Sequence, residues 1–257
     1  MMNKTVLITG STSGIGLALA KQFAKEGYQI MFHGLESNGN EIAKAIGEKY
    51  EVKVAFSKAN LLKSDAVEDL VAETINSFGK LHILVNNAGI QYVSPIEDFP
   101  NSKYEDIIAI NMNAAFYASK AAWKQMKSQK FGRIINISSV HGLRASEFKS
   151  AYVAAKHGVI GMTKVLALEG APFNITCNAI CPGYVKTPLV EGQIKDQAKA
   201  HHMTEVEVIE KVMLKKQAVK QFVPVDTIAD MALLLAKETS STITGTSFAL
   251  DGGWSAQ

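Results

Sequence analysis

The chain of 257 residues has the length of one large α/β domain and can bury a substantial core. Its 47% hydrophobic and 20% charged residues are ordinary for a soluble globular protein. The net charge of +3 rests on lysines, since Arg133 and Arg144 are the two arginines. This charge is too small to predict a nucleic-acid partner or an anionic membrane surface.

The two cysteines, Cys177 and Cys181, lie four residues apart in one apolar run. On an extended strand they share a face but are too far apart for a disulfide, so we expect buried thiols in a reducing compartment. His201 and His202 are expected to face solvent, and no metal site is predicted. The chain has no apolar stretch of about twenty residues and no leader-like N-terminus, which favours a cytoplasmic protein without a membrane partner.

A glycine-rich turn follows the first apolar run. Residues 5–9 read as a strand, Gly10, Gly14 and Gly16 follow, and residues 17–25 have helical periodicity. Glycines let backbone N–H groups approach a pyrophosphate at the positive end of a helix. The spacing is G-x-x-x-G-x-G, and a simple tight turn is the alternative. Its position after the first strand favours a dinucleotide site.

The second strand, at residues 28–33, predicts which dinucleotide is bound. The residue after this strand usually meets the adenosine ribose, where an acid selects a free 2′-hydroxyl and a base selects a 2′-phosphate. Neither Ser13 nor Leu35 is basic, and Glu36 lies near. A 2′-phosphate has no obvious cationic partner here, so NAD is favoured over NADP.

Strands and helices alternate along the rest of the chain. Helices are expected at residues 38–49, 64–78 and 226–236, and further strands at residues 52–57, 81–85, 175–181 and 245–250. Such alternation predicts a parallel, doubly wound sheet with its ligand at the carboxyl ends of the strands. The sequence N-N-A-G at residues 86–89 follows one of these ends and leaves room for a flat ring, although it also fits a plain turn.

A serine, a tyrosine and a lysine carry the expected chemistry. Tyr152 lies thirteen positions after Ser139, and Lys156 follows Tyr152 at i+4. On a helix, residues at i and i+4 share a face, so the phenol and the ammonium can point at one ligand. We expect the ammonium to lower the tyrosine pKa from its usual value near 10, which brings it closer to the working pH of a proton acceptor.

These motifs, with Asn111 and the Pro182-Gly183 pair, stand in the order and spacing of the short-chain dehydrogenase/reductase family, which the chain resembles to the end of D-G-G-W. Within the family it resembles the bacterial enzymes acting on D-3-hydroxybutyrate, through N-N-A-G-I-Q, H-G-L, K-S-A-Y-V-A-A-K-H-G-V and C-P-G-Y-V-K-T-P-L-V-E-G-Q-I. The resemblance implies a single Rossmann-type domain over residues 1–257. About seven parallel strands, helices on both faces and a helical lid at residues 189–217 are expected.

The resemblance also implies roles for individual residues. The catalytic set comprises Asn111, Ser139, Tyr152 and Lys156, with Asn111 anchoring a water chain that carries the proton outward. NAD is expected to contact Gly10, Thr12, Ser13, Gly14, Ile15, Gly16, Leu35, Asn60, Leu61, Asn87, Ala88, Gly89, Tyr152, Lys156, Pro182, Gly183, Val185 and Thr187. Substrate is expected to contact Gln91, Ser139, His141, Lys149, Tyr152, Tyr184 and Gln193. Singly, Ser139 could cap a strand end and Gln91 or Gln193 could be a loop amide; the joint pattern favours a site.

Two departures from the family pattern stand out. Asn60 replaces the usual aspartate that meets the adenine amino group, and Tyr184 replaces a frequent tryptophan. In the lid, Thr204 and Glu207 form a possible capping box before an apolar stripe of Val206, Ile209 and Met213. Trp254 could line the site or an interface of the homotetramer that the resemblance implies.

Three functions are weighed. The leading hypothesis is reversible, NAD-linked oxidation of D-3-hydroxybutyrate to acetoacetate, because Gln91, His141, Lys149 and Gln193 offer donors to a carboxylate. The neighbouring alternative is an NADPH-dependent reductase of 3-ketoacyl thioesters, whose substrate lacks that carboxylate. A non-catalytic dinucleotide-binding regulator is the alternative of another class, against which the intact serine, tyrosine and lysine argue.

Overall fold

A computed structural model describes residues 4–187, 190–192, 194, 198 and 203–256. Its core is one seven-stranded sheet in the order β3-β2-β1-β4-β5-β6-β7, and every neighbouring pair is parallel. The strands are β1 (Thr5–Ile8), β2 (Gln29–His33), β3 (Val54–Ser57), β4 (Ile83–Asn86), β5 (Gly132–Ile137), β6 (Ile175–Pro182) and β7 (Ser247–Leu250). The predicted doubly wound parallel sheet is therefore confirmed.

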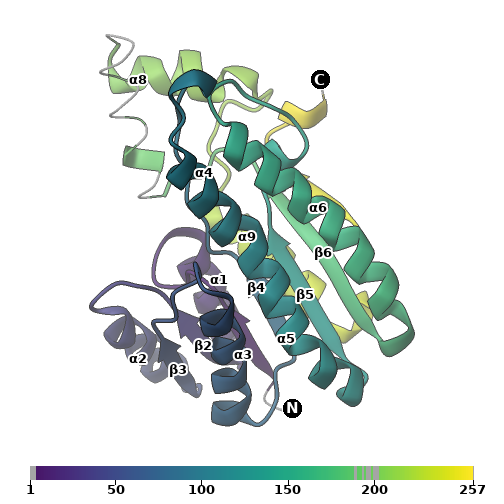
Figure 1. Ribbon diagram of the computed structural model, residues 1–257. Helices are drawn as coiled ribbons and strands as arrows, with labels where there is room; N and C mark the ends of the chain where they lie inside the picture. Colours follow the sequence, from purple (N-terminus) through teal and green to yellow (C-terminus); the bar gives the residue numbers. More distant parts are fainter. Residues whose placement is uncertain (1–3, 188–189, 193, 195–197, 199–202, 257) are drawn as a thin grey trace.

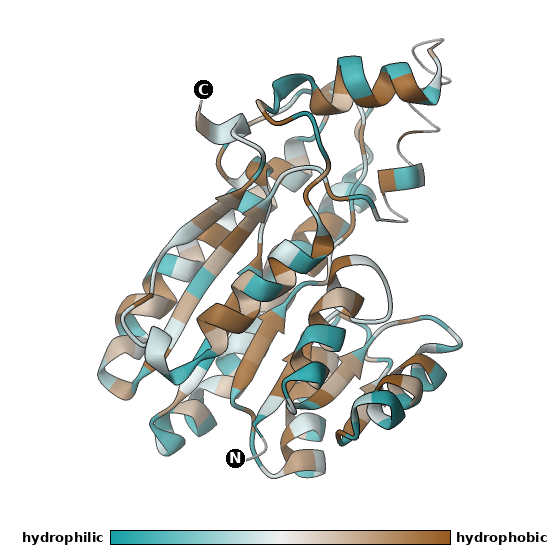
Figure 2. Ribbon diagram, turned by 180° about the vertical axis from the view of Figure 1, so that it is seen from behind, coloured by the Kyte–Doolittle hydropathy of each residue, from teal (hydrophilic) through white to brown (hydrophobic). Residues whose placement is uncertain are grey.

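The described helices cover both faces of the sheet (Figure 1). They are α1 (Gly14–Lys25), α2 (Gly39–Tyr50), α3 (Ser64–Phe78), α4 (Asn101–Ile108), α5 (Ala114–Gln129), α6 (Ser150–Gly170), α8 (Glu205–Val208) and α9 (Val225–Ala236). Along β1, Val6 and Ile8 pack with α1, α2 and α9, whereas Leu7 packs with α3, α5 and α6. A strand buried on both faces has no polar side, which is why β1 reads as a continuous apolar run. Figure 2 shows these hydrophobic strands between more hydrophilic helix surfaces.

The order of the strands places the ligand site. Strand β1 lies between β2 and β4, so the chain connections leave β1 in one direction along the sheet and β4 in the other. Such a switch point opens a crevice at the carboxyl ends of the strands. In Figure 1, α8 and the C-terminus lie at the same end of the molecule as the beginning of α6. The glycine-rich turn follows β1 and the N-N-A-G segment follows β4. Because both segments lie at the carboxyl ends of these strands, both open into this crevice.

The described part of the predicted helical lid contains short helical segments. The capping box is present, since Thr204 Oγ1 accepts from the Glu207 N–H at 3.2 Å and Glu207 accepts from the Thr204 N–H at 3.1 Å. The helix it starts, α8, gives way to π-helical turns at Ile209–Met213. Val206 is 63% exposed, whereas Val208 is buried. Val206 was thus wrongly placed in the packed stripe, because the capping box turns Val208 inward instead.

Both cysteines lie in β6, in the interior of the sheet. Cys177 and Cys181 are buried free thiols, as predicted, and burial raises their pKa values to about 12 and about 11. Among the described helices, none combines the length and apolar character needed to cross a bilayer. Within the same residues, no group of three or more metal-ligating side chains is found.

Candidate active site

The turn after β1 has the backbone conformation that its glycines permit. Gly10 and Gly14 have φ angles of +62° and +52°, in the left-handed region that favours glycine. A Cβ on Gly16 would overlap the Gly10 carbonyl and lie 2.6 Å from the Asn87 side-chain nitrogen. Ser13 precedes α1 without capping it through its side chain. The first N–H groups of α1 therefore face the cleft, a geometry that suits a pyrophosphate.

Asn87 joins the N-N-A-G segment to this turn. Its side-chain amide donates to the backbone oxygens of Thr9 and Gly10, both at 2.9 Å. Thr9 Oγ1 in turn accepts from the N–H groups of Asn87 and Ala88, each at 3.0 Å. The segment is thus part of the wall of the crevice, not a plain surface turn.

One cleft brings together most of the residues predicted to bind the cofactor. Its lining includes Gly10, Thr12, Ser13, Gly14, Ile15, Gly16, Leu35, Asn60, Leu61, Asn87, Ala88, Gly89 and Thr187. An adjoining cavity contains the predicted Pro182, Gly183 and Val185, and it shares Ile15 and Thr187 with the cleft. The two openings thus form a path from the glycine-rich turn to the catalytic residues.

An acidic group lies where the adenosine ribose is expected. Thr12 donates a short hydrogen bond to the Glu36 carboxylate, and a Cβ on Gly34 would overlap both side chains. Burial alone would raise the Glu36 pKa, but the Thr12 hydroxyl and nearby backbone N–H groups hold that pKa below its usual value. The carboxylate is therefore ionised and faces the cleft. Asn60 also lines the cleft, and its side-chain oxygen accepts from the Leu62 N–H at 3.1 Å.

Sequence reasoning missed His33, the last residue of β2. Its Nδ1 accepts from the Gly10 N–H at 3.0 Å, and its Nε2 donates to the Ala59 carbonyl at 2.9 Å. Burial lowers the His33 pKa, so the ring is neutral with its proton on Nε2. The ring ties the glycine-rich turn to the segment that carries Asn60. Its position next to Gly34 was the available signal, but only the adjacency of β1, β2 and β3 gives it meaning.

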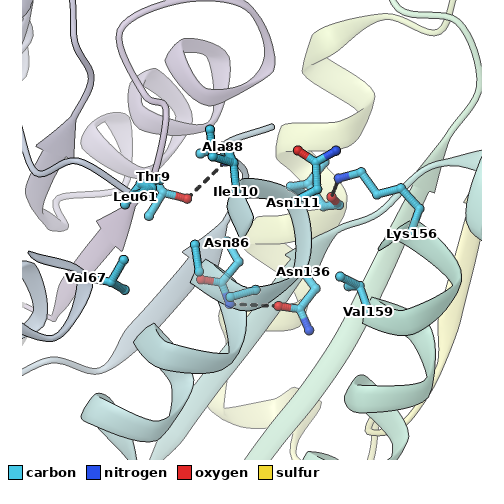
Figure 3. A pocket seen from close by; sticks show the side chains of 13 residues that line it. Thr9, Leu61, Val67, Asn86, Ala88, Ile110, Asn111, Asn136, Lys156 and Val159 are labelled. Carbon is cyan, nitrogen blue, oxygen red and sulfur yellow. Dashed lines mark hydrogen bonds between the residues drawn. The ribbon is translucent and has the colours of Figure 1, made fainter. Parts of the chain in front are cut away.

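Asn111 lies in a π-helical turn, Ala109–Asn113, between α4 and α5. Its side chain makes a reciprocal pair with the Ile90 backbone, accepting from the N–H at 2.8 Å and donating to the carbonyl at 2.9 Å. π-helical turns often occur at functional sites. Figure 3 shows the Lys156 ammonium pointing toward Asn111 across a small cavity. Asn111 and Lys156, both predicted as members of the catalytic set, thus line the same cavity.

The floor of this cavity is a buried chain of polar side chains. Asn86 donates to Asn136 Oδ1 at 2.8 Å (Figure 3), and Asn136 donates to Thr163 Oγ1 at 2.9 Å. These residues come from β4, β5 and α6, so the chain ties the centre of the sheet to the helix that carries Tyr152 and Lys156. A buried network with its members bonded in this way rigidifies the site above it.

The pKa of Tyr152 differs from the sequence expectation. Burial raises that pKa to about 12, although a hydrogen bond from Ser139 acts in the opposite direction. The Lys156 ammonium lies 5.5 Å from the Tyr152 ring centre and donates to the Ile137 carbonyl at 2.9 Å. Burial also lowers the Lys156 pKa to about 8. The predicted lowering of the tyrosine pKa was thus wrong, because desolvation of the phenol has the largest effect on it.

The adjoining cavity contains six of the seven residues predicted to meet the substrate: Gln91, Ser139, His141, Lys149, Tyr152 and Tyr184. The seventh, Gln193, lies outside the described residues, as do His201 and His202. Lys149 is 6% exposed, so its ammonium is an interior group of the cavity. Burial first, and Lys216 second, lower its pKa to about 8. It remains mostly protonated at neutral pH and can bind an anion.

The His141 ring lines the cavity and is neutral. Burial, with Lys149 and Lys216 nearby, lowers its pKa to about 3. Nδ1 lies 3.3 Å from the Ser139 hydroxyl, and Nε2 lies 3.1 Å from the Ser146 hydroxyl. The ring can therefore offer one N–H donor to a ligand or a neighbour, but no positive charge.

The sequence left the place of Trp254 open, and the structure puts it in the cavity wall. Its ring stacks on Tyr184 with 5.8 Å between centroids and 23° between planes. The His141 ring meets Trp254 edge-on at 5.3 Å. The departure at Tyr184 thus keeps an aromatic wall in the cavity that Ser139 and Tyr152 also line.

Similarity to known proteins shows the family of this chain. The family model for the short chain dehydrogenase family matches residues 4–198, and the chain belongs to this family. It is thus an oxidoreductase of a family that uses nicotinamide dinucleotide cofactors.

Particular relatives match over the full chain. It is 49% identical to the D-beta-hydroxybutyrate dehydrogenase of Rhizobium meliloti (strain 1021) and 44% identical to that of Cupriavidus necator, with 100% of both chains covered in each case. Among solved structures, a variant of actinorhodin polyketide ketoreductase with NADPH superposes with a TM-score of 0.93 at 28% identity, covering 99% of this chain and 98% of the other.

Proposed function

We propose that this protein catalyses the reversible, NAD-linked oxidation of D-3-hydroxybutyrate to acetoacetate. The observation that carries the proposal is the buried Lys149, whose ammonium shares one cavity with the hydroxyls of Ser139 and Tyr152. A small hydroxy acid needs a cation or strong donors for its carboxylate beside the group that takes its hydroxyl proton. The similarity to two proteins named D-beta-hydroxybutyrate dehydrogenase supports the same substrate.

The catalytic residues supply proton transfer and orientation. In the oxidation, Tyr152 accepts the proton of the substrate hydroxyl, and the Ser139 hydroxyl donates to the reacting oxygen as it becomes a carbonyl. Bound NAD supplies the acceptor for the hydride, which carries the two electrons away from the carbinol carbon. Lys156 exchanges the released proton with the cavity that it shares with Asn111. Because one proton is released for each alcohol oxidised, alkaline pH favours oxidation.

The high pKa of Tyr152 suits the reverse reaction as well. At about 12, the phenol stays protonated at neutral pH and can donate its proton to the oxygen of acetoacetate. For oxidation the same phenol must pass its proton onward, and Lys156, with a pKa of about 8, can change its protonation state near working pH. Tyr152 and Lys156 thus connect the reacting oxygen to the cavity that Lys156 and Asn111 line.

Three features of the cleft support NAD as the cofactor. The glycine-rich turn fits a pyrophosphate, because Gly10 and Gly14 have positive φ angles and a side chain at Gly16 would collide with the turn. The ionised Glu36 lies at the ribose end, where it accepts a hydrogen bond from a free 2′-hydroxyl and repels a 2′-phosphate. Leu35, 69% exposed, offers that phosphate no positive charge.

The substrate's carboxylate is expected to bind the polar side chains that line the cavity. Lys149 provides the charge, and Gln91 and neutral His141 provide further polar contacts. Gln193, on the proposed lid at residues 189–217, is expected to complete the group when the lid covers the substrate. We expect the stacked rings of Tyr184 and Trp254 to limit the length of the substrate chain that the cavity accepts.

The outer faces of α5 and α6 carry apolar groups that support the proposed homotetramer. The cytoplasm is the proposed location. A groove between the two helices is lined by Phe116, Lys120, Trp123, Lys124, Lys127, Leu166 and Glu169. Phe116 is 47% exposed and Leu168 is 78% exposed. A second copy of the chain packing its own helices here would bury these apolar groups. Light scattering on the purified protein measures the assembly directly.

A substrate panel tests the proposed function. D- and L-3-hydroxybutyrate are each offered with NAD and NADP, and acetoacetyl-CoA is offered with NADH and NADPH. We expect turnover of the D-acid with NAD and little with the other combinations. Reduction of the thioester alone would support the ketoacyl reductase instead. Tight NADH binding without oxidation of any hydroxy acid would support a non-catalytic regulator.

A further inference from the structure

Gln217, at the end of the lid segment, has a fully buried side chain. Its Oε1 accepts from the Tyr184 N–H at 3.1 Å. Its Nε2 donates to the carbonyls of Val219 at 3.2 Å and Gln221 at 2.8 Å. Both amide protons and one oxygen lone pair are thus used, so this buried polar group is well satisfied.

Two glycines make room for this amide. A Cβ on Gly183 would lie 2.8 Å from the Gln217 oxygen and 2.9 Å from the Asp251 Cα. A Cβ on Gly252 would lie 3.0 Å from the Gln217 nitrogen. Gly183 precedes Tyr184, and Gly252 belongs to the C-terminal D-G-G-W segment. The Gln217 amide therefore fills the junction of three chain segments: the loop after β6, the end of the lid segment and the C-terminal turn.

Backbone hydrogen bonds complete the junction. Val219 N–H donates to the Gly252 carbonyl at 2.9 Å, and Val223 N–H donates to the Tyr184 carbonyl at 2.8 Å. The Asp251 carboxylate accepts from the N–H groups of Gly253 at 3.0 Å and Ser255 at 2.9 Å, which fixes the turn that carries Trp254. Tyr184 and Trp254 form the stacked aromatic wall of the substrate cavity. They belong to two different chain segments that meet at this junction.

We propose that Gln217 is a positioning residue that sets the aromatic wall of the substrate cavity, and with it the selection of short hydroxy acids. The selectivity part of this proposal rests on the proposed function. Gln217 is not among the residues that line the cavity or the cofactor cleft, so it acts through Tyr184 and Trp254. Loss of its hydrogen bonds frees the Tyr184 backbone and the turn at Val219 and Gln221. Because the Val219 N–H of that turn holds the Gly252 carbonyl, the C-terminal segment is loosened indirectly and the two rings can separate.

The test replaces the amide by a side chain of similar length. Gln217→Met removes all three side-chain hydrogen bonds, and Gln217→Glu keeps the acceptor but places a carboxylate against two carbonyls. The matched control is Gln221→Met, because Gln221 is exposed and joins the junction only through its backbone. Circular dichroism and NADH binding verify the fold of each variant. Should Gln217→Met fail to fold, Gln217→Glu carries the same comparison.

Kinetics and fluorescence give independent readouts. We expect both Gln217 variants to raise the KM for D-3-hydroxybutyrate about tenfold and to lose preference over D-3-hydroxyhexanoate, with the KM for NAD unchanged. In a Trp123→Phe background, Trp254 is the single tryptophan, and we expect acrylamide to quench it more strongly in the Gln217 variants than in the Gln221 control.

The two readouts separate the positioning role from the proposed function. If wild-type protein does not oxidise the acid but quenching of Trp254 still rises in Gln217→Met, the proposed function fails and the positioning role stands. If quenching, chain-length preference and KM match those of Gln221→Met, the positioning role is overturned. An effect confined to the KM for NAD also overturns it.

Discussion

The Lys149 ammonium donates a hydrogen bond of 3.5 Å to the Tyr184 hydroxyl and lies 5.5 Å from the centre of its ring. Among the described residues that line the substrate cavity, Lys149 is the one cation, and it contacts the cavity's aromatic wall. An ammonium held in this way is pre-oriented for a carboxylate, and a charged hydrogen bond of this kind contributes about 1.5–3 kcal/mol.

We therefore expect Lys149→Met to raise the KM for 3-hydroxybutyrate at least tenfold and to leave kcat within a few-fold, the pattern of lost ground-state binding. Steady-state kinetics with saturating NAD measures both constants. Lys215→Met, which removes an exposed lysine near the end of the lid segment, is the control. An unchanged KM would remove Lys149 from the carboxylate site.

The pKa of Lys149 adds a pH dependence. Because burial lowers this pKa to about 8, the ammonium is lost as the pH rises through that value. We expect the KM for the acid to rise above pH 8 in the wild type and to stay nearly flat in Lys149→Met. Measurements between pH 7 and pH 9.5 test this, and an equal rise in both proteins would contradict it.

The motifs that the sequence predicted correctly are those whose partners are local or follow each other along the chain. The positive φ angles of Gly10 and Gly14 follow from the turn itself, and Tyr152 and Lys156 share a helix face. His33 was missed because its partners, Gly10 and Ala59, come together only when β2 pairs with both β1 and β3. Strand order is a tertiary property, and local sequence patterns do not predict it.

Burial is the second property that sequence reasoning estimates poorly. The spacing of Tyr152 and Lys156 was correct, but their desolvation depends on the whole surrounding core, and it raises the tyrosine pKa instead of lowering it. The place of Trp254 could not be predicted from sequence either. This residue lies near the end of the chain, and it lines the cavity because the C-terminal turn packs at the junction around Gln217.

Tyr152→Phe tests the proton-transfer role. The substitution keeps the ring in its cavity but removes the hydroxyl, so we expect turnover to fall by about a thousandfold or more while NADH binding stays within a factor of about two. Rates are measured in both directions, and binding is measured by NADH fluorescence. Turnover retained within tenfold would assign proton transfer to another group.

Acid stability depends on two buried histidines. Burial lowers the pKa of His33, and lowers that of His141 to about 3, from an ordinary 6.5. As the pH falls below 6.5, the unfolded chain binds protons that the native state does not, so the native state loses stability. Their contribution is therefore complete above pH 6.5 and is lost progressively as the pH falls toward the folded pKa values.

Urea unfolding between pH 7.5 and pH 4.5 measures this dependence. We expect His141→Gln to unfold with a shallower pH dependence than the wild type, by up to about 1.4 kcal/mol per pH unit. His157→Asn, at an exposed position on α6, is the control. Identical pH slopes for His141→Gln and the wild type would show that the imidazole is not buried in its neutral form.

Phe148, immediately before Lys149, has a φ angle of +64° although it carries a bulky side chain. Left-handed backbone costs such residues about 1–2 kcal/mol, whereas asparagine tolerates it. Phe148 is 53% exposed, so its replacement gives up part of the ring's contact area, and the relief of backbone strain has to exceed that loss. We expect Phe148→Asn to raise the free energy of unfolding by about 1 kcal/mol and the melting temperature by about 2–4 °C. Glu147→Asn, at the exposed neighbouring position, should give no such gain. A fall in stability for Phe148→Asn would mean that the aromatic contacts of Phe148 outweigh the strain in its backbone.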